Sequence, residues 1–187
     1  HMLIRSLPRI LLALLVLALL PGAASAQSAP DSSSQSLWRD TSETSFTQTA
    51  GGRWFVPQIY RSLSVDPLAL VATLGQAPLE NSPEAKTSPL QLSLPVPDGT
   101  FQRFSIYNSP IMEPALAAKF PGYQTYIAVG IDDPNAYGRL DWTLFGFHAM
   151  ILTPNGQFFI DPYQRGDVRH YISYYKKDYQ PADKTFN

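Results

Sequence analysis

The sequence has no cysteine among its 187 residues. A thiol nucleophile, a zinc site with cysteine ligands, a disulfide and a cysteine-based inhibitory switch are therefore excluded within this chain. Histidine is also scarce, with three in the whole chain, and His1, which precedes Met2, is interpreted as a cloning remnant. The fold must then be stabilised by its apolar core, to which an aromatic content of 12% contributes.

Three catalytic signatures are also missing from the sequence. It contains no His-Glu-x-x-His, no Gly-x-Ser-x-Gly and no glycine-rich phosphate loop after a strand. The formal charge of −1 comes without a basic patch, which argues against binding of nucleic acid. The sequence therefore predicts no catalytic residue, no metal site and no cofactor.

The first 26 residues have the layout of a secretory signal peptide. Arg5 and Arg9 precede an apolar run over Ile10 to Leu20, and an Ala-Ser-Ala tripeptide follows. The run is shorter than the roughly 20 residues that a membrane anchor needs. We expect cleavage between Ala26 and Gln27, export to the periplasm or the medium, and no attachment to the membrane afterwards. Loss of two of the 14 basic residues leaves 12 against 15 acidic ones, a net charge of −3.

The rest of the chain divides by composition into three parts. Residues 27–52 are rich in Ser, Thr and Gln and predict a flexible polar linker, in which Trp38 and Phe46 are the large side chains that could dock on a domain. Residues 53–179 hold the apolar periodicity of a folded domain. Residues 180–187 predict a loose tail that leads toward a catalytic domain absent from this chain.

Two short helices are expected in the folded part. Asp66 and Pro67 suit the start of a helix that Gly75 can end, with Leu68, Val71 and Leu74 on one face. A second helix is predicted over residues 113–120. Residues 81–89 between them predict a polar loop.

The strands are expected to form hairpins. In residues 90–106 the apolar side chains alternate, and a turn at residues 97–99 with a left-handed glycine places Leu92 opposite Phe104. In residues 145–163 we pair Thr153 with Gln157, which sets Met150 opposite Ile160. The sequence therefore predicts an α+β, β-rich fold, mainly an antiparallel sheet of hairpins, as a sheet or a sandwich, with two short helices.

The candidate catalytic groups have simpler structural interpretations. The predicted hairpin places His148 on an apolar face, which favours a core or edge histidine over a metal ligand. His170 is interpreted as a half-exposed strand residue, with a pH-sensitive contact as the alternative. Four aspartates are most simply turn or cap residues, although paired acid and base groups or a calcium site are the functional alternatives: Asp132, Asp133, Asp141 and Asp161.

The last predicted strand is rich in tyrosine. Tyr171 and Tyr175 alternate with Ile172 and Tyr174, so the side chains divide between two faces. The tyrosines are either framework residues of the sheet or anchors for a sugar or peptide. We take four residues as candidates for framework or partner contacts: Tyr163, His170, Tyr171 and Tyr174.

An ordered set of motifs resembles a known family. It comprises Leu-Pro-x-Pro-Asp-Gly at 94–99, Pro-x-Met-x-Pro-x-Leu-Ala at 110–117, Gly-Ile-Asp-Asp-Pro at 130–134, and Asp-Pro-Tyr to His-Tyr at 161–171. The set is similar to the N-terminal pro-domain of secreted bacterial reprolysin-like zinc metalloproteases, and it covers residues 53–179. In that family a catalytic domain with His-Glu-x-x-His-x-x-Gly-x-x-His follows.

The resemblance implies a non-catalytic pro-domain whose partner is the cognate metalloprotease catalytic domain. Such a domain assists folding of the protease, keeps it latent during export, or does both. The alternative is a free-standing exported module that binds a glycan or a peptide. A third hypothesis, a metal-independent hydrolase that uses Asp161 and His170, is the weakest of the three.

Overall fold

The computed structural model describes residues 37–46 and 52–180, which belong to one compact unit, Asp31–Asn187. The predicted signal peptide, its cleavage point at Ala26 and Gln27, and the tail beyond residue 180 lie outside the described residues. In the described ranges the elements are β1 (Trp38–Asp40), the 3₁₀ helix η1 (Glu43–Ser45), β2 (Arg61–Val65), α2 (Pro67–Leu74), α3 (Pro83–Thr87), β3 (Leu90–Pro95), β4 (Phe101–Asn108), α4 (Pro114–Ala117), β5 (Gln124–Gly130), β6 (Tyr137–Thr143), β7 (Gly146–Thr153), β8 (Gly156–Pro162), β9 (His170–Tyr175) and the 3₁₀ helix η2 (Lys176–Asp178).

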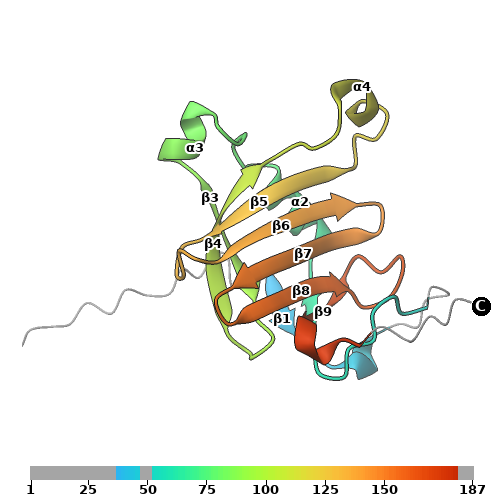
Figure 1. The fold of residues 1–187 in the computed structure, drawn as a ribbon. Coiled ribbons are helices and arrows are strands. Elements are labelled where there is room, and N and C mark those ends of the chain that lie inside the picture. Colours follow the sequence, from blue (N-terminus) through green and yellow to red (C-terminus); the bar gives the residue numbers. More distant parts are fainter. Residues whose placement is uncertain (1–36, 47–51, 181–187) are drawn as a thin grey trace, which may run out of the picture. The chain divides into compact units, whose positions relative to one another are not determined.

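The strands form one antiparallel sheet with the order β1-β2-β9-β8-β7-β6-β5-β4-β3. From β3 to β9 each strand pairs with its neighbour in sequence, because connections between consecutive antiparallel strands can be short (Figure 1). Strands β1 and β2 extend the sheet beyond β9. The predicted β-rich α+β fold is thus confirmed, and its form is a single, nearly closed sheet.

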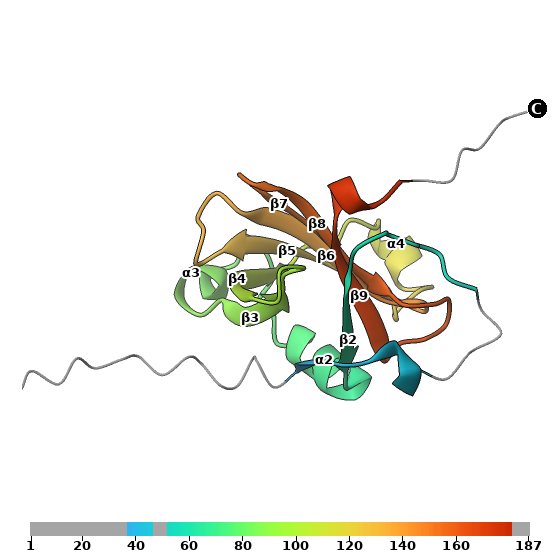
Figure 2. The ribbon, with the colours of Figure 1, turned by 90° about the horizontal axis from the view of Figure 1, so that it is seen from below.

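The sheet curves around one main hydrophobic core, which is packed by its inner face and by α2 (Figure 2). Large side chains from distant strands meet there without contact to solvent, among them Trp38, Phe104 and Tyr171. A second, smaller cluster lies on the opposite face, which we call the outer face. It contains Phe46, Tyr163, Ile172 and Tyr174. Every strand therefore sorts its side chains between two faces.

The first predicted helix is α2, with a different buried face from the one expected. The Asp66 carboxylate accepts hydrogen bonds from the backbone N–H groups of Leu68 and Ala69, as predicted for a cap. The buried side chains are Pro67, Leu70 and Leu74, while Leu68 is 80% exposed. Most residues of this short helix are apolar. The periodicity of the sequence therefore did not indicate which of them face the core.

Two further helices flank the sheet. Helix α4 matches the second predicted helix. Helix α3 lies in the segment that was predicted as a polar loop, and that prediction is wrong for residues 83–87. The signal was present, since the Ser82 hydroxyl caps the helix at the Ala85 N–H and Pro83 occupies its first position.

The two predicted hairpins differ in outcome. The register of β3 and β4 is as predicted, with Leu92 opposite Phe104, and Gly99 has a positive φ of 95°. In β7 and β8, Thr153 pairs with Gly156, so Met150 lies opposite Phe159 and not Ile160. A shift of one residue moves alternate side chains to the other face. Phe158 and Ile160 therefore face the main core, away from His148.

The described part of the predicted linker departs from the prediction, because residues 37–46 belong to the fold. Strand β1 pairs with β2, and Trp38 is 1% exposed in the main core, where its ring contacts Phe147 and Tyr171. Phe46 packs on the outer face against Tyr163. Trp38 and Phe46 are the two large side chains that the sequence indicated could dock, and they supply the apolar burial that a strand at the end of a sheet needs.

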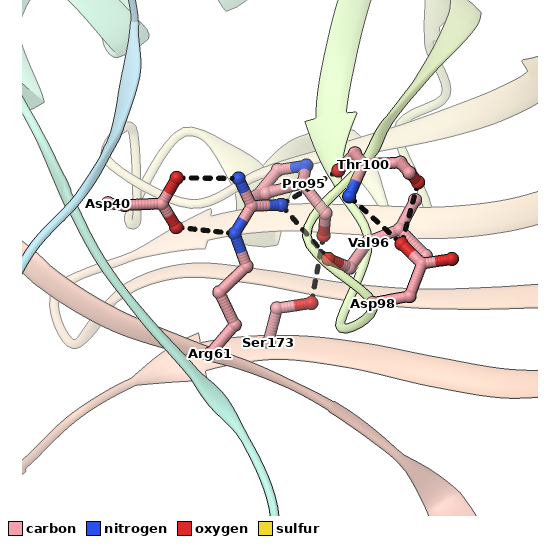
Figure 3. A network of polar contacts seen from close by, with 7 residues as sticks. All are labelled: Asp40, Arg61, Pro95, Val96, Asp98, Thr100 and Ser173. Atoms are coloured by element: carbon pink, nitrogen blue, oxygen red, sulfur yellow. Dashed lines mark hydrogen bonds and ion pairs between the residues drawn. The ribbon is translucent and has the colours of Figure 1, made fainter.

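A polar network holds the β3–β4 hairpin against the far end of the sheet (Figure 3). The buried Arg61 guanidinium forms a bidentate pair with Asp40, at 2.6 and 2.9 Å, and donates to the carbonyls of Val96 and Thr100. Ser173 donates to the Pro95 carbonyl at 2.8 Å. Asp40, Arg61 and Ser173 lie on β1, β2 and β9. Their side chains therefore link this end of the curved sheet to the β3–β4 hairpin, where no backbone strand pairing does so.

Candidate functional site

Four polar side chains gather on the outer face of β6 to β9. They are Asp141, His148, Asp161 and Tyr174, which we call the outer-face polar cluster. Asp141 and His148 are direct partners across β6 and β7. His148 Nδ1 lies 2.8 Å from Asp161 Oδ1, and the Tyr174 hydroxyl donates to Asp161 Oδ2 at 2.7 Å. Asp161 is therefore held between a histidine and a tyrosine, in place of the turn role that the sequence suggested.

Burial and charge set the protonation of this cluster. Burial opposes the charged form of His148, but the hydrogen bond to Asp161 and the charges of Asp161 and Asp141 outweigh it and raise the pKa of His148 above 6.5. Burial also raises the pKa of Asp141 above 3.8. Desolvation, with Asp161 as its neighbour, raises the pKa of Tyr174. The cluster thus favours a protonated imidazole between carboxyl groups.

Aromatic side chains cover the cluster. The Trp54 ring stacks above His148, with ring centroids 6.4 Å apart, and meets Phe145 at 5.1 Å. The Arg165 guanidinium lies over the rings of both Trp54 and Phe145. His148 keeps 21% of its side chain exposed. The cluster is therefore reached from solvent only in part.

The segment that carries Trp54 is fastened to the outer face at several points. Arg53 donates to the Tyr60 hydroxyl and lies 4.5 Å from the centre of the Tyr163 ring. Tyr163 in turn donates to Glu43 at 2.6 Å, and this hydrogen bond raises the pKa of Tyr163 to about 12. Phe46 packs on Tyr163 at 4.5 Å. Residues 43–46 and 53–60 thus contribute to a layer over β8 and β9.

The second histidine belongs to a separate pair. His170 Nδ1 lies 2.7 Å from Asp167 Oδ2, and Asp167 also accepts from the backbone N–H groups of Arg169 and His170. The ring of Phe46 lies 4.3 Å from that of His170. Asp167 therefore fixes the entry into β9, and the imidazole presents its Nε2 edge away from this carboxylate.

The structure places the four predicted contact residues mostly inside the domain. Tyr171 and Tyr174 are 0% and 2% exposed, and Tyr163 is 9% exposed. The Tyr171 hydroxyl accepts from the Phe147 N–H and donates to the Val168 carbonyl. These tyrosines act as framework residues here. His170 is half-buried and is the one of the four with appreciable surface.

Sequence reasoning missed one member of the site, Trp54, and did not predict that Asp141, His148 and Asp161 lie together. Trp54 was not among the candidate residues, and Asp141 was most simply a turn or cap residue, with a paired acid and base as an alternative. A correct register for β7 and β8 would have placed His148 beside Asp161, which was the available signal. No sequence pattern placed Trp54, because its contact with His148 depends on how residues 53–60 cross the sheet.

The chemistry open to this cluster is limited. Asp161 and His148 can hold and transfer a proton. Within residues 37–46 and 52–180, no group of three or more His, Cys, Asp and Glu side chains is arranged to hold a metal ion. The same part of the chain contains no helix with the length and apolarity that a membrane crossing requires.

Comparison with known proteins gives no relative for this chain. No protein-family model, no curated protein and no solved structure matches it.

Proposed function

We propose that this chain is the non-catalytic pro-domain of an exported zinc metalloprotease, which assists folding of the protease or maintains its latency. The ordered motif set at residues 94–171 supports the proposal through its resemblance to reprolysin-like pro-domains. Three of the four motifs lie at the β3–β4 turn, at α4 and at the β5–β6 connection, and the fourth spans the end of β8 and the start of β9.

The observation that carries the proposal is an apolar row across the outer face. Val129, Tyr137 and Leu152 are direct neighbours on β5, β6 and β7, and are 37%, 41% and 40% exposed. Met150 follows on β7 at 39%. Contiguous exposed apolar side chains on rigid strands favour a protein partner. A catalytic domain seated on this row would bury all four side chains.

The proposed role requires no chemistry from the domain itself. In the described residues the hydrogen-bond partner of His148 is Asp161, and the Tyr174 hydroxyl donates to the same carboxylate. A raised pKa makes that phenol a poor nucleophile. We therefore assign the outer-face polar cluster to the framework of the domain.

The test uses residues 27–187 and the catalytic domain of the cognate protease, identified from the native gene beyond Asn187. We expect binding, together with inhibition of peptide cleavage or a higher yield of refolded protease. Replacement of Val129, Tyr137 and Leu152 by serine should weaken binding by about tenfold or more, because central apolar anchors dominate interfaces.

The matched control replaces three exposed apolar side chains outside the row, Val56, Ile59 and Leu68, which are 60%, 68% and 80% exposed. This variant should bind as the parent does. Absence of binding, inhibition and refolding by the parent would contradict the pro-domain proposal. If a glycan or peptide bound instead, and the native gene held no protease domain, the free-standing module would replace it.

A further inference from the structure

A second surface, separate from the apolar row, has the composition of a binding site. It is a groove of about 480 Å³ where β1, β2 and β9 meet the start of α2. Arg39, Ser64 and His170 are consecutive neighbours across these three strands and share one face. Arg169 precedes β9 on the same groove. Four potential hydrogen-bond donors thus converge on one hollow.

In the part of the chain that the structure describes, the two arginines of this groove have no side-chain partner, whereas Asp66 in the groove and Asp167 beside it accept hydrogen bonds. Asp66 accepts from two N–H groups at the start of α2, and Asp167 accepts from His170 and two backbone N–H groups. Among the described residues, Arg39 and Arg169 are exposed and have no hydrogen bond or ion pair with another side chain. The groove therefore offers two guanidinium groups that have no side-chain partner within residues 37–46 and 52–180, and such groups bind carboxylates bidentately.

The apolar side of the groove indicates the kind of ligand. Leu37, Val65 and Ala69 line it beside the arginines, and none of its lining residues is Trp, Tyr or Phe. A sugar would favour an aromatic platform, whereas a peptide with alternating acidic and small apolar side chains matches both parts. The volume also exceeds what one carboxylate or phosphate fills.

We propose that this groove binds an acidic peptide segment, with two of its carboxylates held by Arg39 and Arg169. The apolar side chains between those carboxylates pack on Leu37 and Ala69, and Ser64 and His170 supply hydrogen bonds to the peptide. This site is distinct from the apolar row and does not depend on the domain being part of a protease.

The experiment measures fluorescence polarisation of a labelled hexapeptide that alternates glutamate and alanine, with residues 27–187 at fixed ionic strength. We expect saturable binding that weakens as salt is added. The double variant R39Q/R169Q should lose at least tenfold in affinity. The control K86Q/K119Q removes two exposed lysines that lie outside the groove, so it should keep the parent affinity.

Four results would overturn the proposal. Equal binding of a hexapeptide that alternates glutamine and alanine would show that carboxylates are not recognised. Equal losses of affinity in the two double variants would show that binding depends on net charge alone. Absence of saturable binding by the parent would remove the site. Preference for a sulfated glycan or inorganic phosphate over the acidic peptide would assign the groove to another ligand. Circular dichroism of each variant confirms that the fold is retained.

Discussion

At the scale of single residues, the outer-face polar cluster shows how an ordinary histidine gains an unusual environment. His148 lies between Asp141 and Asp161 and beneath Trp54. Each neighbour comes from a different strand or segment. The consequence is a coupling between protonation and folding that can be measured directly.

Asp161→Asn removes the charge that pairs with His148 and leaves a buried amide in its place. We expect the free energy of unfolding to fall by about 2 kcal/mol, because hydrogen bonds between charged groups contribute more than neutral ones. Urea denaturation measures the change. Asp132→Asn, at an exposed pair with Arg103, should cost at most about 1 kcal/mol. Equal effects of the two substitutions would argue against a special role for Asp161.

The pH dependence of stability follows from the same cluster. The raised pKa of His148 means that its contribution is complete below 6.5 and is lost as pH rises through the folded-state pKa. The raised pKa of Asp141 also makes stability fall as pH rises above 3.8. We therefore expect the free energy of unfolding to decrease from pH 6 to pH 8, as followed by urea denaturation.

His148→Gln should flatten this decrease, and titration of the His148 ring by NMR should give a pKa above 6.5. At acidic pH the dependence has the opposite sign, so the free energy of unfolding falls as the pH falls. The hydrogen bond from Arg61 lowers the pKa of Asp40, and that from Arg103 lowers the pKa of Asp132, so their contributions are lost as pH falls below 3.8. A parent curve without slope between pH 6 and 8 would contradict the assignment.

At the scale of elements, two features join segments that are far apart in sequence. Strand β1 brings Trp38 into the main core, and the Arg61 network joins β2 to the β3–β4 hairpin. Both act where the sheet comes close to closing. Each can be tested by one substitution.

Trp38→Ala empties a buried position in the main core. Loss of a large aromatic side chain from a core typically costs about 3–5 kcal/mol, and we expect a loss of that size. Urea denaturation followed by circular dichroism measures it. Trp54→Ala, at a ring that is 38% exposed, is the control and should cost less. An unchanged midpoint of urea denaturation for Trp38→Ala would indicate that residues 37–46 are a linker and do not stabilise the domain.

Arg61→Met removes the buried guanidinium, so the carbonyls of Val96 and Thr100 lose their charged donor and keep one backbone N–H donor each. We expect a loss of about 3 kcal/mol in the free energy of unfolding, because the substitution breaks a buried charged network and removes the bidentate partner of Asp40. Amide hydrogen exchange should show faster exchange in the β3–β4 hairpin than in β7. Asp40→Asn should cost less, since the Asp40 side chain is 66% exposed.

At the scale of the whole molecule, β9 is the strand on which the sheet depends. It pairs with β2 on one side and with β8 on the other, so the first and last parts of the described chain meet there. Strand pairs of such large sequence separation are costly to form and form late. Folding should therefore require almost the entire domain.

A chain that ends at Val168 lacks β9 and should not fold. A chain that ends at Gln180 retains β9 and η2 and should fold as the parent does. Dispersion of the amide NMR signals distinguishes the two outcomes. Folding of the shorter chain would show that β3 to β8 form an independent sheet, and would move the boundary of the domain.

The difference between the two hairpins shows where sequence reasoning ended. Apolar residues alternate cleanly from Leu90 to Leu94, so one register alone buries them, and the prediction is confirmed. Around Met150 and Phe159 the apolar residues are consecutive, and either register buries a full set. The two-residue turn between Thr153 and Gly156 settled the register, and with it the position of His148 beside Asp161.

The sequence by itself determined the β-rich class, the antiparallel hairpins, the start of α2 and the division of Tyr171 and Tyr174 between two faces. These properties depend on local periodicity and turn chemistry, which neighbouring residues carry. Only the tertiary structure decided that Trp38 is a core residue, that Arg61 closes the sheet and that Arg39 lies beside Ser64 and His170. Those contacts join segments separated by up to about 130 residues, and their energies depend on burial that no local pattern specifies.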